Sequence, residues 1–409
     1  MWTKCNVYLT FGSLYGYYVG MIERPYWQQK VLHAWKRRPI VWLSGVRRAG
    51  KTVLARMLPR VVYLNCDLPA VVRRLEDCES FFRSQDQGAW LVLDEVHRLM
   101  DPSLVLKVAA DAFPHLRVLA TGSSTLAATR KFRDTLTGRK ETIYLPPVLW
   151  SECVGPFQVS DLDRRLLHGG LPEALLSPTK DETFFAEWID SYYARDIAEL
   201  FSVRNRSGFL ALLRLLLHQS GGMADISKLS SECGLSRATV TSHIDAMAVA
   251  HAVFPVRPFH GGSRRELVHR PKLYAFDTGF VTHARGWTSL REEDRGVLWE
   301  HLVLDTLRAV LSSGDIRYWR DKTGREVDFV LPGPSGIVDA IECKISPARF
   351  DVTGLRAFRA LYPLGRNWLV CPYEQEPWQR SWGTIAVDVV NANDLVRAIE
   401  PRAVQEPEP

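Results

Sequence analysis

The sequence has no cluster of cysteines and no long uninterrupted apolar run, and both absences exclude classes of protein. Its seven cysteines, an odd number, are scattered, and no two have C-x-x-C spacing. This pattern indicates neither a zinc site nor a disulfide framework and is typical of a reducing cytosol, so we expect a cytoplasmic protein. We expect no membrane contact, because the weakly apolar stretch 7–21 is too short to cross a bilayer and is interrupted by glycine and serine.

The composition is not extreme either. Of the 409 residues, 46% are hydrophobic and 24% are charged, as in typical globular proteins, and the length indicates two or three domains. A net charge of +6 permits contact with nucleic acid without requiring it. Residues 1–21 are predicted to be an N-terminal extension, either a poorly ordered segment or a targeting signal, because Met21 begins a plausible domain.

The strongest motif in the chain lies between Gly45 and Thr52 and has the pattern G-x-x-x-x-G-K-[ST]. An apolar run, 40–43, precedes it and a helix-forming run, 53–58, follows it, as a phosphate-binding loop requires. Glycines let backbone N–H groups wrap phosphate oxygens, and the helix that follows adds its positive dipole end. The residues predicted to bind ATP here are Gly45, Val46, Arg47, Arg48, Ala49, Gly50, Lys51, Thr52 and Val53.

Within this loop two side chains have separate roles. Lys51 is expected to reach the β- and γ-phosphates, and Thr52 to supply a hydroxyl to Mg²⁺. About forty residues later, an apolar run ends in Asp94 and Glu95, as expected of a buried parallel strand. Asp94 at its end would hold the Mg²⁺ shell, and Glu95 would polarise the attacking water.

Two further residues are candidates for sensing or completing this site. The expected strand 116–120 ends in a polar run, 121–124, in which Ser123 could sense the γ-phosphate. Arg139 precedes the expected strand 141–145 and could point into a neighbouring subunit of a homo-oligomer, the alternative being an ordinary surface arginine.

Residues 22–147 therefore resemble an AAA-type P-loop ATPase, through the phosphate loop, Asp94-Glu95, the polar strand end and Arg139 at the position of an arginine finger. The resemblance implies ATP and Mg²⁺ as cofactors. In related ATPases a G-G-x-P element lies in a helical lid over the adenine, so residues 148–220 are expected to form a helical lid and linker. Pro172 is then a candidate nucleotide contact, the alternative being a plain loop proline.

Residues 221–285 have the outline of a winged helix-turn-helix. Two short helices, 225–233 and 237–248, are followed by two strands that flank a basic glycine-containing tip. Such a domain could contact DNA, or could serve only for packing and dimerisation. The polar residues expected on its DNA-facing surface are Arg237, Thr239, Thr241, Ser242 and His243 on the second helix, with Arg264 and Arg265 on the wing.

Residues 286–400 carry a second possible chemistry. Residues two apart in a strand share a face, so Glu342 and Lys344 point together, and a hairpin places Asp328 beside them. Asp328 and Glu342 could bind Mg²⁺ through oxygen, and Lys344 could stabilise or activate an attacking water. The alternative is a salt-bridged pair on the face of a sheet.

This pattern resembles the restriction-endonuclease-like PD-(D/E)xK fold. Asp328, Glu342 and Lys344 match D…ExK, Glu300 matches the helix glutamate often found before it, and Val327 departs from the usual proline. The whole chain also resembles a family of prokaryotic AAA-type ATPases that end in a domain of unknown function with an endonuclease-like fold.

The combined expectation is an α/β protein with four parts, followed by a disordered tail, 401–409. These parts are an AAA-type ATPase core, a helical lid, a winged helix and a C-terminal endonuclease-like α/β domain. Its function would be ATP hydrolysis in association with DNA, with metal-dependent nuclease activity at the C-terminal site. The alternative is an ATP-driven signalling switch whose last two domains are non-catalytic and bind a protein partner.

Overall fold

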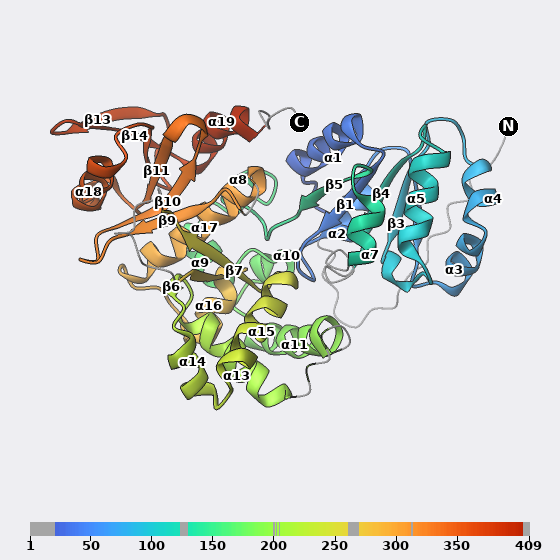
Figure 1. The fold of residues 1–409 in the computed structure, drawn as a ribbon, viewed down its shortest axis with the longest axis horizontal. Helices are drawn as coiled ribbons and strands as arrows, with labels where there is room; N and C mark the ends of the chain where they lie inside the picture. Colours follow the sequence, from blue (N-terminus) through green and yellow to red (C-terminus); the bar gives the residue numbers. More distant parts are fainter. Residues whose placement is uncertain are drawn as a thin grey trace.

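The computed structural model describes residues 21–122, 130–198, 201, 203, 205–260, 270–311 and 314–403. In Figure 1 the N-terminal part of the chain lies to the right, and the central and C-terminal parts fill the left. Several predictions fall outside the described residues: nearly all of the N-terminal extension, Ser123, the wing tip with Arg264 and Arg265, and the end of the tail.

The N-terminal part is built on a parallel sheet of five strands in the order β2-β3-β4-β1-β5. The strands are β1 Ile40–Ser44, β2 Val61–Asn65, β3 Trp90–Asp94, β4 Arg117–Thr121 and β5 Lys140–Tyr144. Every residue of β1 is buried, and in β3 only Trp90 is partly exposed, which confirms the buried parallel strand expected before Asp94 and Glu95. Because successive side chains alternate, Ile40 and Trp42 enter one core, and Val41 and Leu43 enter the opposite one.

Helices cover both faces of this sheet, so the unit has three layers (Figure 1). One face packs against α1 Pro25–Arg37 and α2 Lys51–Met57, and the other against α3 Pro69–Glu76, α4 Cys78–Arg83, α5 Pro102–Ala112 and α7 Arg130–Leu136. α3 and α4 follow each other almost directly, with only Asp77 between them. Asp77 separates them, because its side chain accepts a hydrogen bond from the backbone N–H of Ser80 and starts a new helix.

The segment expected to be a helical lid is helical. It contains α8 Trp150–Val154, α9 Leu162–His168, α10 Pro172–Leu176, α11 Glu182–Tyr192, the π-helical turn η2 Tyr193–Ala198 and α13 Arg206–His218. A buried ion pair ties α8 to the start of the chain: Arg24 donates from Nε to Glu152 Oε1 at 2.7 Å and from Nη2 to Oε2 at 2.6 Å. Two parallel hydrogen bonds of this kind fix both position and orientation.

The next segment contains β6 Gly222–Met223, α14 Ile226–Cys233, α15 Arg237–Val249, β7 Val253–Pro258 and β8 Lys272–Ala275. Ser236 caps α15, since its hydroxyl accepts a hydrogen bond from the Thr239 N–H at 3.1 Å. Arg237, Thr241 and Ser242 are exposed and Thr239 is partly buried. The expectation that His243 is exposed is wrong: it is buried, and its ring meets Phe209 of α13 edge-on, because this side of α15 faces the core.

The C-terminal strands form one sheet with β6, β7 and β8. They are β9 Arg317–Arg320, β10 Glu326–Pro332, β11 Val338–Cys343, β12 Asn367–Val370, β13 Trp378–Trp382 and β14 Ile385–Val390. The sheet has nine strands in the order β13-β14-β12-β11-β10-β9-β7-β8-β6. Because β7 pairs in parallel with β9, the sheet is continuous across the predicted domain boundary at residues 285 and 286.

Four helices accompany these strands: α16 Thr278–Ala284, α17 Asp294–Val310, α18 Thr353–Leu361 and α19 Ala392–Ala403. α17 lies centrally between the C-terminal strands and the helical region (Figure 1), and most of its residues are buried. None of the helices within the described residues combines the length and apolar character needed to span a membrane.

Candidate functional site

The phosphate loop connects β1 to α2 in a shape that needs glycine at its two ends. Gly45 has φ +143°, and a Cβ there would lie 2.5 Å from the carbonyl oxygen of Leu145. Gly50 has φ +94° and directly precedes α2, which begins at Lys51 as predicted. At both glycines the backbone therefore has a conformation that residues with a side chain rarely adopt, and at Gly45 there is also no room for a Cβ atom.

We expect Gly45→Ala to weaken nucleotide binding by roughly 5- to 150-fold, because the added methyl must displace either the loop or Leu145 at a cost of roughly 1–3 kcal/mol. Titration with a fluorescent ATP analogue measures this. Gly88→Ala is the matched control, since Gly88 also has positive φ (+77°) but has no neighbour within 4 Å. Equal nucleotide affinity of the two variants would contradict a close-packed loop.

Lys51 lies inside the loop rather than in solvent. Its Nζ donates to the carbonyl oxygens of Gly45 at 2.8 Å and Val46 at 2.9 Å. Burial lowers the pKa of Lys51, and the carboxylates of Glu95, Asp196 and Asp94 oppose that shift. The Lys51 ammonium is therefore held by two neutral carbonyl oxygens, with three carboxylates nearby. Charged phosphate oxygens would be stronger hydrogen-bond acceptors for it than these carbonyls.

Thr52 and Asp94 are brought together as the sequence predicted. Thr52 Oγ1 donates to Asp94 Oδ2 at 2.9 Å, and the hydroxyls of Tyr63 and Thr121 donate to the same carboxylate. Asp94 is 3% exposed. Thr121 belongs to the polar run 121–124 that the sequence placed at this strand end, whereas Tyr63 was not identified from the sequence, because a neighbouring strand of the parallel sheet supplies it.

This arrangement suits Mg²⁺ held jointly with a nucleotide. Within the described part of the chain, no group of three or more His, Cys, Asp or Glu side chains could hold a metal ion. Mg²⁺ commonly takes one or two carboxylates and completes its octahedron with phosphate oxygens and water. Thr52 and Asp94 fit that role, since together they offer one hydroxyl and one carboxylate at the carboxyl end of β3.

Glu95 follows directly in a strained conformation. Its φ of 58° is left-handed, which is uncommon outside glycine and is frequent at functional sites. Its N–H donates to Thr121 Oγ1 at 3.1 Å, and its Oε2 lies 3.2 Å from His97 Nδ1. The hydrogen bond from His97 lowers the pKa of Glu95 despite partial burial, so Glu95 is a carboxylate able to accept a proton.

Asp196 is a site residue that sequence reasoning missed. It lies on the π-helical turn η2, and its Oδ2 is 3.4 Å from Nη1 of Arg47 in the phosphate loop. Burial raises the pKa of Asp196, while Arg47 and Lys51 counteract the shift. Only the tertiary approach of η2 to the loop reveals it, although π-helical turns are frequent at functional sites.

The lid also touches the loop through other residues. Arg48 places its guanidinium 5.1 Å from the ring centre of Phe184 on α11. Pro172, the first residue of α10, has its Cγ 3.9 Å from where a Cβ on Gly50 would lie. Pro172 therefore lies beside the loop, and its contact with nucleotide stays a prediction.

Arg139 lies away from this loop, in an ion pair within its own chain. Its guanidinium donates to both carboxylate oxygens of Asp111, from Nε at 2.6 Å and from Nη2 at 2.9 Å. It precedes β5 and so lies at the amino ends of the parallel strands, whereas the phosphate loop lies at their carboxyl ends. Its role as a finger toward another subunit stays a prediction.

The C-terminal residues also gather into one cluster. Lys344 Nζ donates to Asp328 Oδ2 and to Glu342 Oε2, both at 2.9 Å, and the Cys343 N–H donates to Asp328 at 2.8 Å. Glu300 of α17 interacts electrostatically with both carboxylates and lies 3.1 Å from Lys272 Nζ.

Charge in this cluster is concentrated and poorly solvated. Burial and the neighbouring Asp328 raise the pKa of Glu342 to about 8. Burial also opposes ionisation of Asp328, but Lys344 and Lys272 hold its pKa below the ordinary value. Burial pulls the pKa of Lys344 down, but Asp328 and Glu342 together raise it. One ammonium thus serves two carboxylates, and the paired arrangement predicted from the sequence is present.

Comparison with known families divides the chain into three matches. Residues 37–154 match a family described as an AAA domain, and this agrees with the three-layer fold and the phosphate loop. Residues 159–291 and 295–390 match two families described as domains of unknown function, DUF8612 and DUF4143. Residues 37–154 thus form a P-loop AAA-type domain.

Relatives and solved structures are similar to more than half of this chain. An uncharacterized protein of Mycobacterium tuberculosis, Rv2008c, is 27% identical over 325 residues, which are 76% of this chain and 71% of that one. An uncharacterized protein of Haemophilus influenzae is 22% identical and covers 65% of this chain and 74% of its own. A Thermotoga maritima RuvB variant shares 15% identity with a TM-score of 0.30, covering 58% of this chain and 90% of its own.

Proposed function

We propose that the chain binds ATP with Mg²⁺ and hydrolyses it. The observation that carries this proposal is the hydrogen bond between Thr52 and Asp94 beside Lys51, with Glu95 following at the same strand end. Bound Mg²⁺ would neutralise phosphate charge. Lys51 would exchange its two carbonyl partners for phosphate oxygens, and Glu95 would orient and deprotonate the attacking water.

Glu95→Gln is expected to bind ATP as tightly as the wild type but to hydrolyse it about 10²–10⁴-fold more slowly, because an amide cannot accept the proton from water. Phosphate release measures hydrolysis, and nucleotide titration measures binding. Glu79→Gln on the exposed surface of α4 makes the same chemical change away from the loop and should leave both unchanged. Undiminished turnover in purified Glu95→Gln protein would remove Glu95 from the mechanism.

The proposal includes association with DNA. The order α13, β6, α14, α15, β7, β8 supports the winged helix that we propose here, and Arg237, Thr241 and Ser242 are exposed on α15. We propose that this surface contacts DNA phosphates.

We also propose that Arg139 completes the nucleotide site of a neighbouring copy in a homo-oligomer. For that role Arg139 would have to leave Asp111.

A second candidate function, metal-dependent cleavage of nucleic acid, has its own observation. Asp328 and Glu342 converge on the single Nζ of Lys344, with Glu300 close by. Two carboxylates around one point suit a divalent ion, and a lysine beside it suits stabilisation of developing charge. The competing proposal is an ATP-driven switch, in which this cluster is a structural ion pair and the C-terminal part binds a protein partner.

A further inference from the structure

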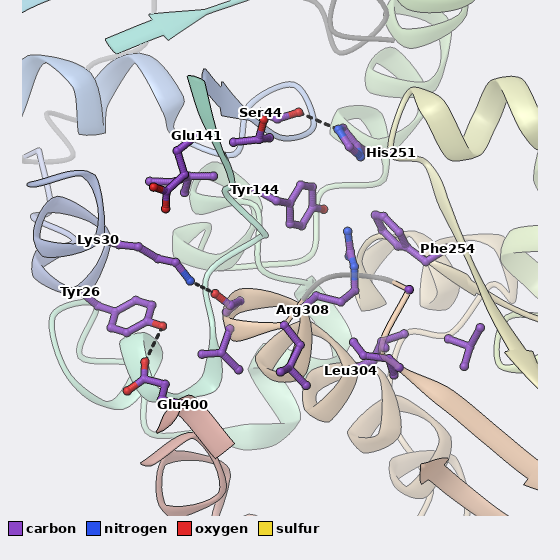
Figure 2. Close-up of a pocket in the computed structure, with 18 of the residues that line it drawn as sticks. Tyr26, Lys30, Ser44, Glu141, Tyr144, His251, Phe254, Leu304, Arg308 and Glu400 are labelled. Atoms are coloured by element: carbon purple, nitrogen blue, oxygen red, sulfur yellow. Dashed lines mark hydrogen bonds between the residues drawn. The ribbon is translucent and has the colours of Figure 1, made fainter. Parts of the chain in front are cut away.

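A large cleft separates the AAA-type unit from the rest of the chain and is distinct from both candidate sites. Its volume is about 1980 Å³, and its walls come from α1 and β5 on one side and from β7, β9, α17 and α19 on the other. Figure 2 shows side chains from these elements pointing toward one another across it. Ser44, which directly precedes the phosphate loop, also lines the cleft and lies 2.7 Å from His251 Nε2.

The cleft is strongly basic. Eight lysines and arginines line it against two glutamates. Both glutamates already have partners, since Glu141 pairs with Arg37 and Glu400 accepts a hydrogen bond from Tyr26. Arg37, Arg308 and Arg397 each have a carboxylate within ion-pair distance, and within the described residues the other five cations of the cleft have none.

Two of these cations stand side by side without compensation. Arg257 of β7 and Arg317 of β9 are direct neighbours in the register of the two parallel strands. Among the residues the structure describes, neither has a carboxylate within ion-pair distance. Like charges directly opposite each other on adjacent strands are destabilising, so their presence costs stability in the isolated chain.

Arg308 provides a buried cation at the inner wall. Its side chain is 8% exposed and its guanidinium lies against the rings of Tyr144 (4.1 Å) and Phe254, as Figure 2 shows. Its Nη1 has no hydrogen-bond partner within the described residues, and the carboxylate of Asp305 is 3.7 Å away. A buried donor left unpaired is costly unless a ligand satisfies it.

Arg257 and Arg317 also connect the cleft to a second cavity. That cavity, about 710 Å³, includes the exposed Thr241 of α15 among its lining residues. These two arginines, which are the only lysines or arginines of the described chain that line the second cavity, therefore lie between the cleft and the surface of the expected winged helix, where Asp245 is also present. A path of cations along an open cleft fits an extended polyanion better than a compact small molecule.

We propose that this cleft binds a nucleic-acid strand through its phosphate backbone, with Arg257 and Arg317 as principal contacts. The inference rests on the nucleic-acid association proposed above, but it places the contact between the two parts of the chain rather than on α15 alone. Binding would relieve the repulsion between the two arginines and give Arg308 Nη1 an acceptor.

The test uses the full chain with Arg257→Gln and Arg317→Gln combined. Fluorescence anisotropy follows a labelled single-stranded DNA of about 20 nucleotides over a range of salt concentrations. Single-strand binding weakens with salt with a slope of about −0.7 per phosphate contact, so losing two contacts should reduce the slope by about 1.4. Because like charges are removed, the variant should unfold at no lower temperature than the wild type.

The matched control combines Arg73→Gln and Arg356→Gln, two exposed arginines that line neither cavity. It should retain wild-type affinity and salt slope, which separates a local contact from the loss of two charges. Duplex DNA and single-stranded RNA, measured in parallel, identify the form of strand that the cleft accepts, and the cleft variant should weaken whichever form binds.

Failure of the inference can be distinguished from failure of the proposed DNA association. If Arg237→Gln weakens binding while the cleft variant matches its control, the contact lies on α15 and the cleft proposal is overturned. If the wild type binds none of the three nucleic acids at low salt, association with nucleic acid is itself rejected. Loss of affinity and salt slope in the cleft variant alone supports the cleft.

Discussion

Lys51→Ala is expected to abolish tight ATP binding and, with it, all measurable hydrolysis. The ammonium is the cation that the phosphate loop places where the β- and γ-phosphates would lie, and its present partners are only the carbonyls of Gly45 and Val46. Without it, the carboxylates of Asp94, Glu95 and Asp196 would repel a triphosphate, and Arg47, already paired with Asp196, would not replace the lost ammonium at the phosphates. Isothermal titration with ATP and Mg²⁺ measures the loss directly.

The Lys51 experiment needs two controls, because the substitution also removes two hydrogen bonds from the loop. Lys36→Ala on the exposed surface of α1 removes a lysine from the same unit and should leave ATP binding unchanged. Lys51→Met keeps most of the buried stem, so it should fold even if the alanine variant does not. ATP affinity within a factor of two of wild type in a folded Lys51→Met protein would contradict the proposed nucleotide site.

The local features of the AAA-type unit could be predicted from the sequence because the chemistry lies in short continuous stretches. A glycine loop between a buried strand and a helix, and a carboxylate pair ending another strand, each specify their own backbone. Thr52 and Asp94 meet because both lie at the carboxyl edge of one parallel sheet. The same logic placed Asp328, Glu342 and Lys344 together, since a hairpin aligns them.

What the sequence did not reveal depends on approaches between segments far apart in the chain. Asp196 reaches the loop through the packing of η2, 149 residues from Arg47. His243 was expected to be exposed because helical periodicity does not identify which face meets α13. The cleft was not predicted at all, because Arg257 and Arg317 lie sixty residues apart and become neighbours only when β7 joins β9.

The C-terminal cluster gives the second large expected effect. Lys344→Ala should destabilise the chain by about 3–5 kcal/mol, because it leaves the buried Asp328 carboxylate beside Glu342 without the ammonium that both accept hydrogen bonds from. Urea unfolding at constant pH measures this. Arg325→Ala is the control, since it breaks a half-exposed ion pair with Asp321 and should cost no more than about 1 kcal/mol.

The response of Lys344→Ala to divalent ions decides between a metal site and a structural ion pair. If Asp328 and Glu342 are metal ligands, Mn²⁺ should occupy the position of the lost ammonium and restore much of the stability, because a ligand that binds only the folded state stabilises it by mass action. The double variant Asp328→Asn with Lys344→Ala lacks one ligand and should not respond. A nuclease would in addition require the wild type to bind Mn²⁺ and to cleave DNA. Both Asp328→Asn and Lys344→Ala would then have to be inactive in cleavage and normal in ATP hydrolysis.

If Mn²⁺ changes the stability of neither variant and the wild type cleaves no single- or double-stranded DNA, the cluster is a structural ion pair. The ATP-driven switch then becomes the better account of the C-terminal part.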